Sequence, residues 1–337
     1  MKNKLLISLT IFTLALSVTG CNKEKQIEDK KKPTKVEEKL SIVDINSDSR
    51  PYAVMVNNHP TVRPLHQGLQ EAFITYEIVV EGGITRYLAL FKDVEDVKIH
   101  GIRSARHYYV DYALENDAYY IHWGGSPQAF AEISKTGIDS YEVYDNKYAY
   151  YDNSLTGINV EHRTYTNTDL LEKAIKKSNY REETNKDLLL NYTAKKVDLS
   201  KEENAKVANQ VDIKYSNSFI SNFTYDADKG YYLKSVNDKK HTDYTTKDQY
   251  HYKNIITYQV KNYTMADVEN KGRQEIENLG SGTGHYITNG YAIPIKWEKK
   301  TNSSQTKYMH MDGTEIDVSD GNTYIAIQPK DQTLTIE

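Results

Sequence analysis

Three arginines lie close to one predicted helix start and a glycine turn, within the densest polar cluster of the chain, between Glu77 and Pro127. Arg103 and Arg106 flank Ser104, the expected N-cap of a helical pattern over 104–115, and Arg86 follows a glycine pair. An arginine beside a helix N-terminus faces the positive end of the helix macrodipole, so a negative group is expected to compensate it. The cluster therefore predicts a site for a phosphate, a carboxylate or an anionic polymer unit. The alternative is a buried ion-pair network with Glu77, Glu81 or Asp111.

A second helix start adjoins this cluster in the sequence. Gly124, Gly125, Ser126 and Pro127 follow a predicted buried strand over 118–123 and precede a helical pattern that ends at Gly137. Serine as the N-cap and proline at the first helical position are typical of a helix start. Backbone N–H groups at such a start bind anions. We therefore assign Gly124, Gly125 and Ser126 to the predicted binding site, together with Ser104.

Proton-transfer chemistry is the second hypothesis for the same region. Glu81 and Asp111 would form an acid/base pair, and His122 would act as a base near Ser126. Against this, Ser126 is already explained as a helix cap, and a histidine in a buried strand is more often part of the core. The sequence also contains no G-x-S-x-G or H-E-x-x-H motif. These residues leave enzymatic function open and favour a non-enzyme.

The sequence predicts no metal site and no cofactor. His59 with His66, and His241 with Asp243, are the nearest groupings, and neither has a recognised ligand spacing. The glycine-rich segment 280–284 lacks the lysine and serine or threonine of a phosphate-binding loop. We expect it to be a loop that allows a mobile turn or a close approach of two backbones.

The elements that must position these residues favour an α+β fold with two domains. Residues 42–180 predict a mixed α/β domain: strands over 52–57, 74–81 and 85–92, the last two as a hairpin, and helices over 104–115, 128–135 and 170–177. Thr166 and Asp169 have the spacing of a capping box before the third helix. Residues 181–206 are rich in charged residues and asparagine and predict an interdomain connection.

Residues 207–337 predict a β-rich domain. Strands are expected over 211–215, 219–225, 231–235, 255–260, 292–298 and 323–328, with a hairpin turn at Asp312-Gly313. The chain contains 29 tyrosines. Tyrosine suits half-exposed sheet faces and also surfaces that stack against sugars, and the sheet is the favoured explanation.

The N-terminus predicts export and lipidation at the only cysteine of the chain, Cys21. Lys2 and Lys4, an apolar run over 5–18 and small residues before Cys21 are typical of a signal peptide, here 1–20. A cysteine directly after a small residue is the pattern at which bacterial lipoproteins are cleaved and acylated. Residues 21–41 are then a disordered, lipid-anchored tether. The predicted location is the extracellular face of the cell membrane, held there by acyl chains such as palmitate.

The charge balance excludes some partners. The full chain carries a formal net charge of −4, and loss of the two lysines with the signal peptide brings it nearer to −6. The protein surface is therefore not expected to be basic overall, and a nucleic-acid partner is not expected. A local cationic pocket is compatible with this balance. Acylation of the only cysteine would also exclude disulfides and thiolate chemistry.

Several motifs, in order along the chain, resemble the YerB-like lipoproteins of Gram-positive bacteria, the family known as DUF3048. A departure lies at His162-Arg163, where asparagine is expected after the histidine. The resemblance covers nearly the whole mature chain and implies a two-domain surface lipoprotein, without an established activity. It rests on the segments 50–60, 76–77, 81–86, 102–106, 122–127, 284–288, 292–297 and 312–313.

Three classes of function follow from these observations. The favoured one is a membrane-anchored binding module for an anionic component of the cell envelope, such as a wall polymer, or for an envelope protein. The second is a hydrolase or transferase that acts on a wall polymer at the same cluster. The third is a structural lipoprotein whose sheet edges or tyrosine-rich faces dock another protein.

Overall fold

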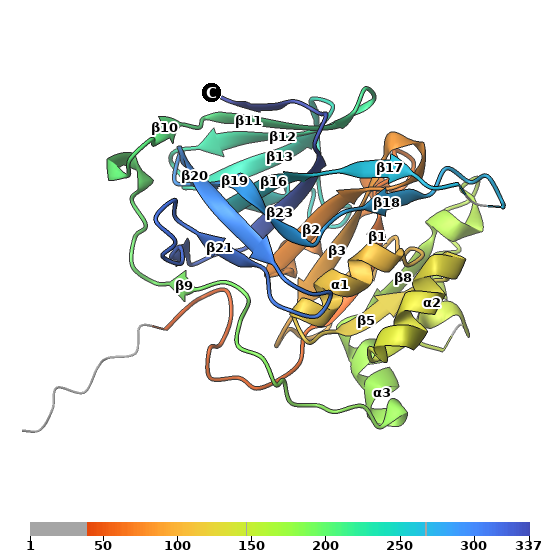
Figure 1. The fold of residues 1–337 in the computed structure, drawn as a ribbon. Coiled ribbons are helices and arrows are strands. Elements are labelled where there is room, and N and C mark those ends of the chain that lie inside the picture. The colour runs from red at the N-terminus through yellow and green to blue at the C-terminus, as the bar shows by residue number, and fades with distance from the viewer. Residues whose placement is uncertain (1–38, 146, 267) are drawn as a thin grey trace, which may run out of the picture. The chain divides into compact units, whose positions relative to one another are not determined.

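One large mixed sheet contains strands from both halves of the sequence (Figure 1). In the computed structural model, which describes residues 39–145, 147–266 and 268–337, its strand order is β10-β20-β19-β16-β23-β2-β3-β1-β5-β6, with β21 paired to β20. Its strands are β1 (Tyr52–Asn57), β2 (Ile74–Val79), β3 (Thr85–Phe91), β5 (Tyr119–His122), β6 (Ser140–Glu142), β10 (Lys206–Val207), β16 (Asn254–Val260), β19 (Gly280–Thr288), β20 (Tyr291–Lys299), β21 (Lys307–Met309) and β23 (Thr323–Pro329).

A second sheet of six strands has the order β14-β13-β12-β11-β24, with β15 paired to β13. Its strands are β11 (Gln210–Ser216), β12 (Phe219–Asp226), β13 (Tyr231–Val236), β14 (Lys239–Lys240), β15 (His251–Tyr252) and β24 (Leu334–Ile336). The remaining strands form three small sheets. One contains β4 (Lys98–His100), β7 (Tyr150–Tyr151) and β8 (Thr164–Asn167). The other two pair β9 (Tyr192–Thr193) with β22 (Val318–Ser319) and β17 (Asn262–Thr264) with β18 (Gln274–Ile276).

The centre of the large sheet is covered on both faces, and the alternation of side chains along β2 explains how. All six residues of β2 are buried. Tyr76 packs against Tyr112 of helix α1 (His107–Glu115), with ring centroids 5.0 Å apart. The next residue, Glu77, faces the second sheet, where its Oε2 accepts a hydrogen bond from Ser221 Oγ at 2.7 Å. Successive side chains of a strand point to opposite faces, so the centre of the sheet lies between the helix and the second sheet.

Three α-helices complete the fold, and their caps test the sequence predictions. Helix α2 (Pro127–Thr136) begins as predicted: Ser126 Oγ accepts the Ala129 N–H at 3.1 Å, and Gly137 ends the helix in the left-handed conformation. Helix α1 begins later than predicted, at His107. Its N-cap is Arg106, whose side chain makes no capping bond, so the assignment of Ser104 as the cap was wrong.

The third helix, α3 (Thr168–Ser178), also has a different cap from the predicted one. Asn167 Oδ1 accepts the Leu170 N–H at 2.8 Å, whereas the Thr166 hydroxyl bonds the Tyr148 carbonyl in the neighbouring segment. Asparagine caps as well as threonine does, so the spacing alone did not distinguish the two residues. None of the helices in the described residues is long and apolar enough to cross a bilayer.

The glycine-rich segment 280–284 is a strand, not the predicted loop. It forms the first half of β19, which pairs with β16 and β20. The glycines are needed for packing: a Cβ atom on Gly284 would lie 2.4 Å from the Thr257 carbonyl oxygen, and one on Gly282 would lie 2.8 Å from Trp297 Nε1. The expectation of a close backbone approach was therefore right, although the expectation of a loop was wrong.

The two predicted segments, 42–180 and 207–337, share one body. Strand β23 pairs in parallel with β2 on one side and with β16 on the other, so the C-terminal segment completes the sheet of the N-terminal segment. The chain from residue 39 onward forms a single compact unit. The fold is strand-rich and broadly α+β, as predicted, and the three α-helices of the described residues all lie within 107–178. The predicted signal peptide, Cys21 and residues 22–38 of the tether lie outside the described residues. The tether was predicted to extend to residue 41, which is wrong at its end: Leu40 is buried in the core, and the Ser41 N–H donates to Asp320 Oδ2 at 2.8 Å.

Candidate functional site

Arg106 and Glu81 form a two-point ion pair at the start of α1. Arg106 Nε donates to Glu81 Oε1 at 2.6 Å, and Nη2 donates to Oε2 at 2.8 Å. Glu81 lies in the tight turn between β2 and β3, where Gly82 and Gly83 both have positive φ angles of 70° and 69°. Burial raises the pKa of Glu81, but the hydrogen bonds and charge of Arg106 and the charge of Arg86 outweigh it, and the net pKa is lowered.

Arg86 lies beneath this pair and is buried. Its Nη1 donates to the Ser104 carbonyl oxygen, and its Nη2 lies 3.9 Å from Glu81 Oε2. Its Nε is buried and has no hydrogen-bond partner among the described residues. Burial, followed by the charge of Arg106, lowers the pKa of Arg86 to about 9; Glu81 opposes this shift, and Arg103 adds to it. Three guanidinium groups thus act on one another around the single carboxylate of Glu81.

Arg103 is the most accessible of the three arginines. Its Nη1 donates to Glu161 Oε2 at 3.0 Å, and the two side chains are 18% and 40% exposed. Its Nε is buried without a partner among the described residues. The predicted counter-ions were Glu77, Glu81 and Asp111. Of these, Glu81 compensates Arg106. Glu161, 58 residues from Arg103, was not predicted. No local spacing in the sequence connects Glu161 with Arg103.

The two predicted helix starts lie side by side. The Ala105 N–H donates to the Gly124 carbonyl at 2.9 Å, and the Ser126 N–H donates to the Ala105 carbonyl at 3.3 Å. Ala105 and Gly125 form a parallel bridge. Gly124 has a positive φ of 72°. The structure therefore brings residues 103–106 and 124–126 together as predicted, but the Ser126 N–H and Oγ are used within the chain, so neither is a free donor.

The predicted proton-transfer residues are held apart in separate networks. Asp111 accepts hydrogen bonds from Asn278 and Asn302, both at 2.8 Å, and its pKa is raised chiefly by burial. His122 bonds the Gly124 carbonyl and the Ser140 hydroxyl, each at 2.9 Å, so both ring nitrogens are occupied. Burial lowers the pKa of His122 to about 4. No contact among the described residues joins Asp111 or His122 to Glu81, so the expected acid/base arrangement is not assembled.

Three aromatic rings, those of Trp123, Tyr144 and Tyr151, come together close to the Arg103 segment. Nothing in the sequence predicted this group. The Trp123 ring stacks on Tyr144 with centroids 5.2 Å apart, and its edge meets Tyr151 at 6.4 Å. Tyr144 is 59% exposed. The backbone N–H of Trp123 donates to the backbone carbonyl of Arg103 at 3.1 Å, so the two residues lie side by side in neighbouring segments. We call Arg86, Arg103 and Arg106 with Trp123 and Tyr144 the arginine–tryptophan surface.

Histidines from distant segments also meet, although no metal cluster is found among the described residues. His66 pairs with His241, its Nδ1 lying 2.8 Å from His241 Nε2, while its Nε2 bonds the Asn57 carbonyl at 2.6 Å. Neither partner is the one suggested by the sequence. Both rings are buried, and burial lowers the pKa of His66 to about 3. Asp243 instead accepts the Gly68 N–H at 2.9 Å and supports the loop next to it.

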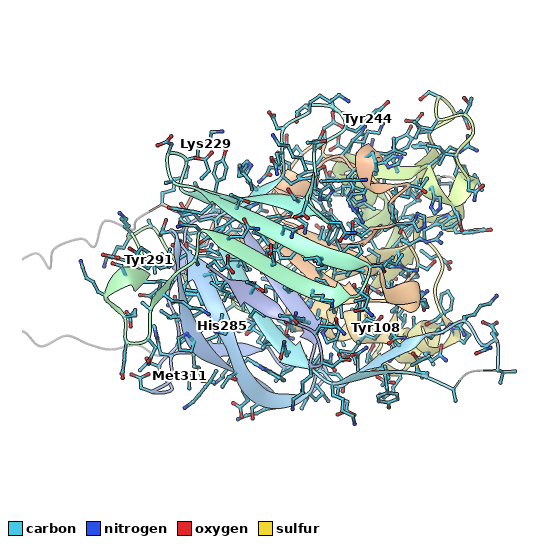
Figure 2. All side chains as sticks on the ribbon, turned by 90° about the horizontal axis from the view of Figure 1, so that it is seen from above. Tyr108, Lys229, Tyr244, His285, Tyr291 and Met311 are labelled. Atoms are coloured by element: carbon cyan, nitrogen blue, oxygen red, sulfur yellow. The ribbon has the colours of Figure 1, made fainter. Side chains whose placement is uncertain are left out.

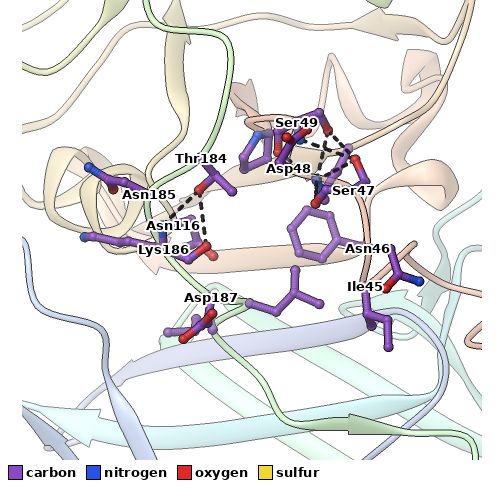
Figure 3. A pocket seen from close by; sticks show the side chains of 15 residues that line it. Ile45, Asn46, Ser47, Asp48, Ser49, Asn116, Thr184, Asn185, Lys186 and Asp187 are labelled. Atoms are coloured by element: carbon purple, nitrogen blue, oxygen red, sulfur yellow. Dashed lines mark hydrogen bonds between the residues drawn. The ribbon is translucent and has the colours of Figure 1, made fainter. Parts of the chain in front are cut away.

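A cavity of about 490 Å³ lies between residues 45–49 and 184–189 (Figure 3). Lys92 Nζ donates to the carbonyl oxygens of Ser47 and Ser49, at 3.1 and 2.7 Å. Across the cavity, Lys186 Nζ donates to the Leu114 carbonyl at 2.7 Å. Both lysine charges on its walls are thus used to hold chain segments together, and we do not assign a ligand to this cavity.

The fold and the order of its segments define the class of protein. Residues 40–181 match the model described as "Protein of unknown function (DUF3048) N-terminal domain", and residues 211–325 match the corresponding C-terminal domain. The chain belongs to the DUF3048 family, as the resemblance predicted.

One solved structure and one sequence resemble the chain in particular. The chain is 31% identical over 210 residues to "Putative lipoprotein YerB" of Bacillus subtilis (strain 168), a match that covers 59% of each chain. The crystal structure of the YerB protein from Bacillus subtilis matches with a TM-score of 0.75 and 25% identity, over 89% of this chain and all of that one. The chain is thus similar to a protein described as a lipoprotein.

Proposed function

We propose that the chain is a lipid-anchored protein of the extracellular membrane face that binds an anionic polymer of the cell envelope. The binding site is the arginine–tryptophan surface. The observation that carries the proposal is an excess of positive charge: three guanidinium groups act on one another, while among the described residues only the carboxylates of Glu81 and Glu161 pair with them. A phosphate or carboxylate group would complete the compensation through charge-assisted hydrogen bonds.

Arg103 is the residue that would meet the ligand first. Its counter-ion, Glu161, is 40% exposed, so a polymer anion can replace that carboxylate without leaving a buried charge unpaired. Nε and Nη2 of Arg106 both donate to the Glu81 carboxylate, and Arg86 is buried. These two residues supply local positive potential, and Arg103 supplies the direct contact.

The aromatic pair gives the surface a second mode of contact. Trp123 stacks on the more exposed Tyr144, and the backbone of Trp123 is bonded to that of Arg103. Flat aromatic faces contact the C–H faces of sugar rings, whereas guanidinium groups bind phosphate and carboxylate. A polymer that alternates sugar or polyol units with anionic groups satisfies both. We infer this class of ligand in preference to an enzymatic substrate, because Glu81, Asp111 and His122 are held in separate networks.

Lipid anchoring follows from the N-terminal pattern and is supported by the likeness to a protein described as a lipoprotein. Residues 1–20 would be removed, Cys21 acylated, and 21–39 would tether the folded part to the membrane. Replacement Cys21→Ser is expected to abolish incorporation of a labelled fatty acid into the protein. Unchanged incorporation in the variant would contradict lipidation at this residue.

The binding test uses the full chain carrying Cys21→Ser and purified Gram-positive cell walls, before and after chemical removal of their phosphate polymers. Sedimentation of the wall measures the bound protein. We expect retention on untreated wall only, and about tenfold weaker binding for Arg103→Ala and for Trp123→Ala, since one charge-assisted hydrogen bond or one aromatic contact contributes about 1–3 kcal/mol.

The chain offers matched controls for both variants. Arg273, like Arg103, is a mostly buried arginine paired with a half-exposed glutamate, with side chains 12% and 52% exposed. Tyr263 is an aromatic residue of strand β17 that is 48% exposed. Arg273→Ala and Tyr263→Ala should bind as the parent does. Equal binding to the depleted wall would refute recognition of the anionic polymer, and release of wall fragments would replace the binding function with an enzymatic one.

A further inference from the structure

A larger cavity lies away from the arginine–tryptophan surface, between the two halves of the sequence. It encloses about 840 Å³, a size typical of ligand pockets. One side is formed by residues 67–71 and 95–98, and the other by β13, β15 and the loop that joins them. Figure 2 labels Lys229, which lines this cavity, and Tyr244, which directly precedes the lining residues Thr245 and Thr246.

Gln67 is the residue that points to a ligand. It lines the cavity, it is only 6% exposed, and its buried Oε1 accepts no hydrogen bond from any described residue. A buried amide oxygen without a donor is costly, and most such atoms in folded proteins have a partner. A bound molecule that donates a hydrogen bond at this point would remove the cost.

A neighbouring glutamine shows which chemical group fits such an amide. Gln70 Nε2 donates to the His251 carbonyl at 3.0 Å, and Gln70 Oε1 accepts the His251 N–H, also at 3.0 Å. Gln70 thus binds both polar groups of one residue's backbone. Gln67, three residues earlier on the same wall, has the same donor and acceptor, and its acceptor is unused.

The walls of the cavity are firmly built, so the buried Gln67 amide is the group that would turn toward a ligand. The Asp243 carboxylate accepts the N–H groups of Gly68 and Thr245 at 2.9 and 2.7 Å, and the Tyr250 hydroxyl at 2.9 Å. Tyr231 and His251 stack with ring centroids 3.9 Å apart. The two walls are thus joined before any ligand arrives, which lowers the ordering cost of binding.

The charges on the walls indicate the side chains that a ligand would carry. The wall from the N-terminal half includes three exposed acidic residues, Glu71, Glu95 and Asp96. Lys98 lies beside them, but its Nζ is directed to Asp152, at 3.9 Å, and to the Tyr165 ring. The opposite wall adds Lys229 and Lys240 together with Asp243 and Asp248, so five carboxylates and three lysines line the cavity, and this net negative charge is complementary to a cation.

We propose that this cavity binds an extended peptide segment that carries a basic side chain. Gln67 hydrogen-bonds to the peptide backbone as Gln70 does to His251, and the basic side chain faces Glu71, Glu95 and Asp96. This site is independent of the anionic polymer site proposed above.

The test uses the full chain carrying Cys21→Ser, labelled with ¹⁵N, and three small probes. They are acetyl-alanyl-lysyl-alanine methylamide, its glutamyl counterpart, and N-acetylglucosamine, which offers an amide on a sugar. The lysyl peptide should shift the backbone signals of residues 67–71 and 231–233, and the glutamyl peptide should bind more weakly. Replacement Gln67→Leu should weaken the lysyl peptide about tenfold.

Folding provides the second measurement. Gln67→Leu removes an unpaired buried oxygen, so its thermal unfolding midpoint should equal or exceed that of the parent. Gln332→Leu, at a position outside the cavity, should leave peptide binding unchanged. Undiminished peptide binding by Gln67→Leu, or shifts of these signals by N-acetylglucosamine and not by the peptides, would overturn the proposal. A large loss of stability in Gln67→Leu would also overturn it, since it would give Gln67 a structural role.

Discussion

Replacement of Arg106 by alanine should destabilise the fold, whereas the same change at Arg103 should not. The contrast follows from their partners. Arg106 and Glu81 are joined by two hydrogen bonds, and their side chains are only 11% and 19% exposed. Arg103 makes one hydrogen bond to Glu161, which is 40% exposed. Arg106→Ala leaves the Glu81 carboxylate with Arg86 Nη2, at 3.9 Å, as its nearest cation.

The expected sizes differ by several-fold. Removing one partner from a fully buried ion pair costs about 3–5 kcal/mol, because the remaining charge is left without compensation. The Arg106 pair is partly solvated, and Arg86 remains nearby, so about 2–3 kcal/mol is expected. For Arg103→Ala, loss of a half-exposed pair lowers the free energy of unfolding by about 0–1 kcal/mol.

Urea unfolding followed by circular dichroism measures both changes on the same chain. A double-mutant cycle with Glu81→Gln isolates the pair: if the Arg106 effect comes from this contact, the double variant should lose less than the sum of the single variants. Equal and small losses in Arg103→Ala and Arg106→Ala would refute the ion-pair argument and make Arg106 a free ligand-binding residue. The same measurement makes Arg103→Ala the preferred variant for testing polymer binding, because its fold should be intact.

Three further outcomes follow from buried groups. His66 and His122 have pKa values of about 3 and about 4, chiefly because of burial, and an unfolded histidine titrates near 6.5. The unfolded chain therefore takes up protons first, so the free energy of unfolding should fall as the pH drops from about 6.5 to 4; His122→Gln should flatten that slope, and an unchanged slope would contradict the assignment. Gly284→Ala should cost at least about 2 kcal/mol in urea unfolding, because its Cβ would overlap a carbonyl of the next strand, whereas the exposed Thr283→Ala should be nearly neutral. Lys234→Met should lower the free energy of unfolding by about 3–5 kcal/mol in urea, because Lys234 and its partner Glu77 are both fully buried. A loss below about 1 kcal/mol would show that hydrogen bonds alone satisfy the Glu77 carboxylate.

Local patterns predicted the elements well where the physical cause is local. The strands over 52–57, 74–81 and 85–92 match β1, β2 and β3 closely, because runs of apolar residues are bounded there by turn residues. The start of α2 was also correct, since a serine cap followed by proline needs only four consecutive residues. The family was likewise recognisable from the order of the motifs along the sequence.

Local patterns failed where a distant segment decides the outcome. Segment 280–284 reads as a loop, yet neighbouring strands require glycine there so that their backbones can approach. The helix start at Ser104 was wrong because residues 103–105 instead extend alongside β1 and residues 123–126, through backbone bonds such as Arg103 N–H to the Met55 carbonyl at 2.9 Å. A cap motif cannot indicate such a competing set of bonds.

The candidate site divides in the same way. The sequence by itself determined which residues carry the charge: Arg86, Arg103 and Arg106 lie in segments short enough for the glycine turn and the helix start to be recognised. Only the tertiary structure decided their roles. It pairs Arg106 with Glu81 and Arg103 with Glu161, and it stacks Trp123 on Tyr144.

The organisation of the chain shows the same division on a larger scale. Composition and motif order marked two segments separated near residues 181–206, but only the pairing of β23 between β2 and β16 merged them into one sheet. The physical reason is that elements depend on neighbours in the sequence, whereas counter-ions and strand partners depend on which surfaces are buried together when the chain folds.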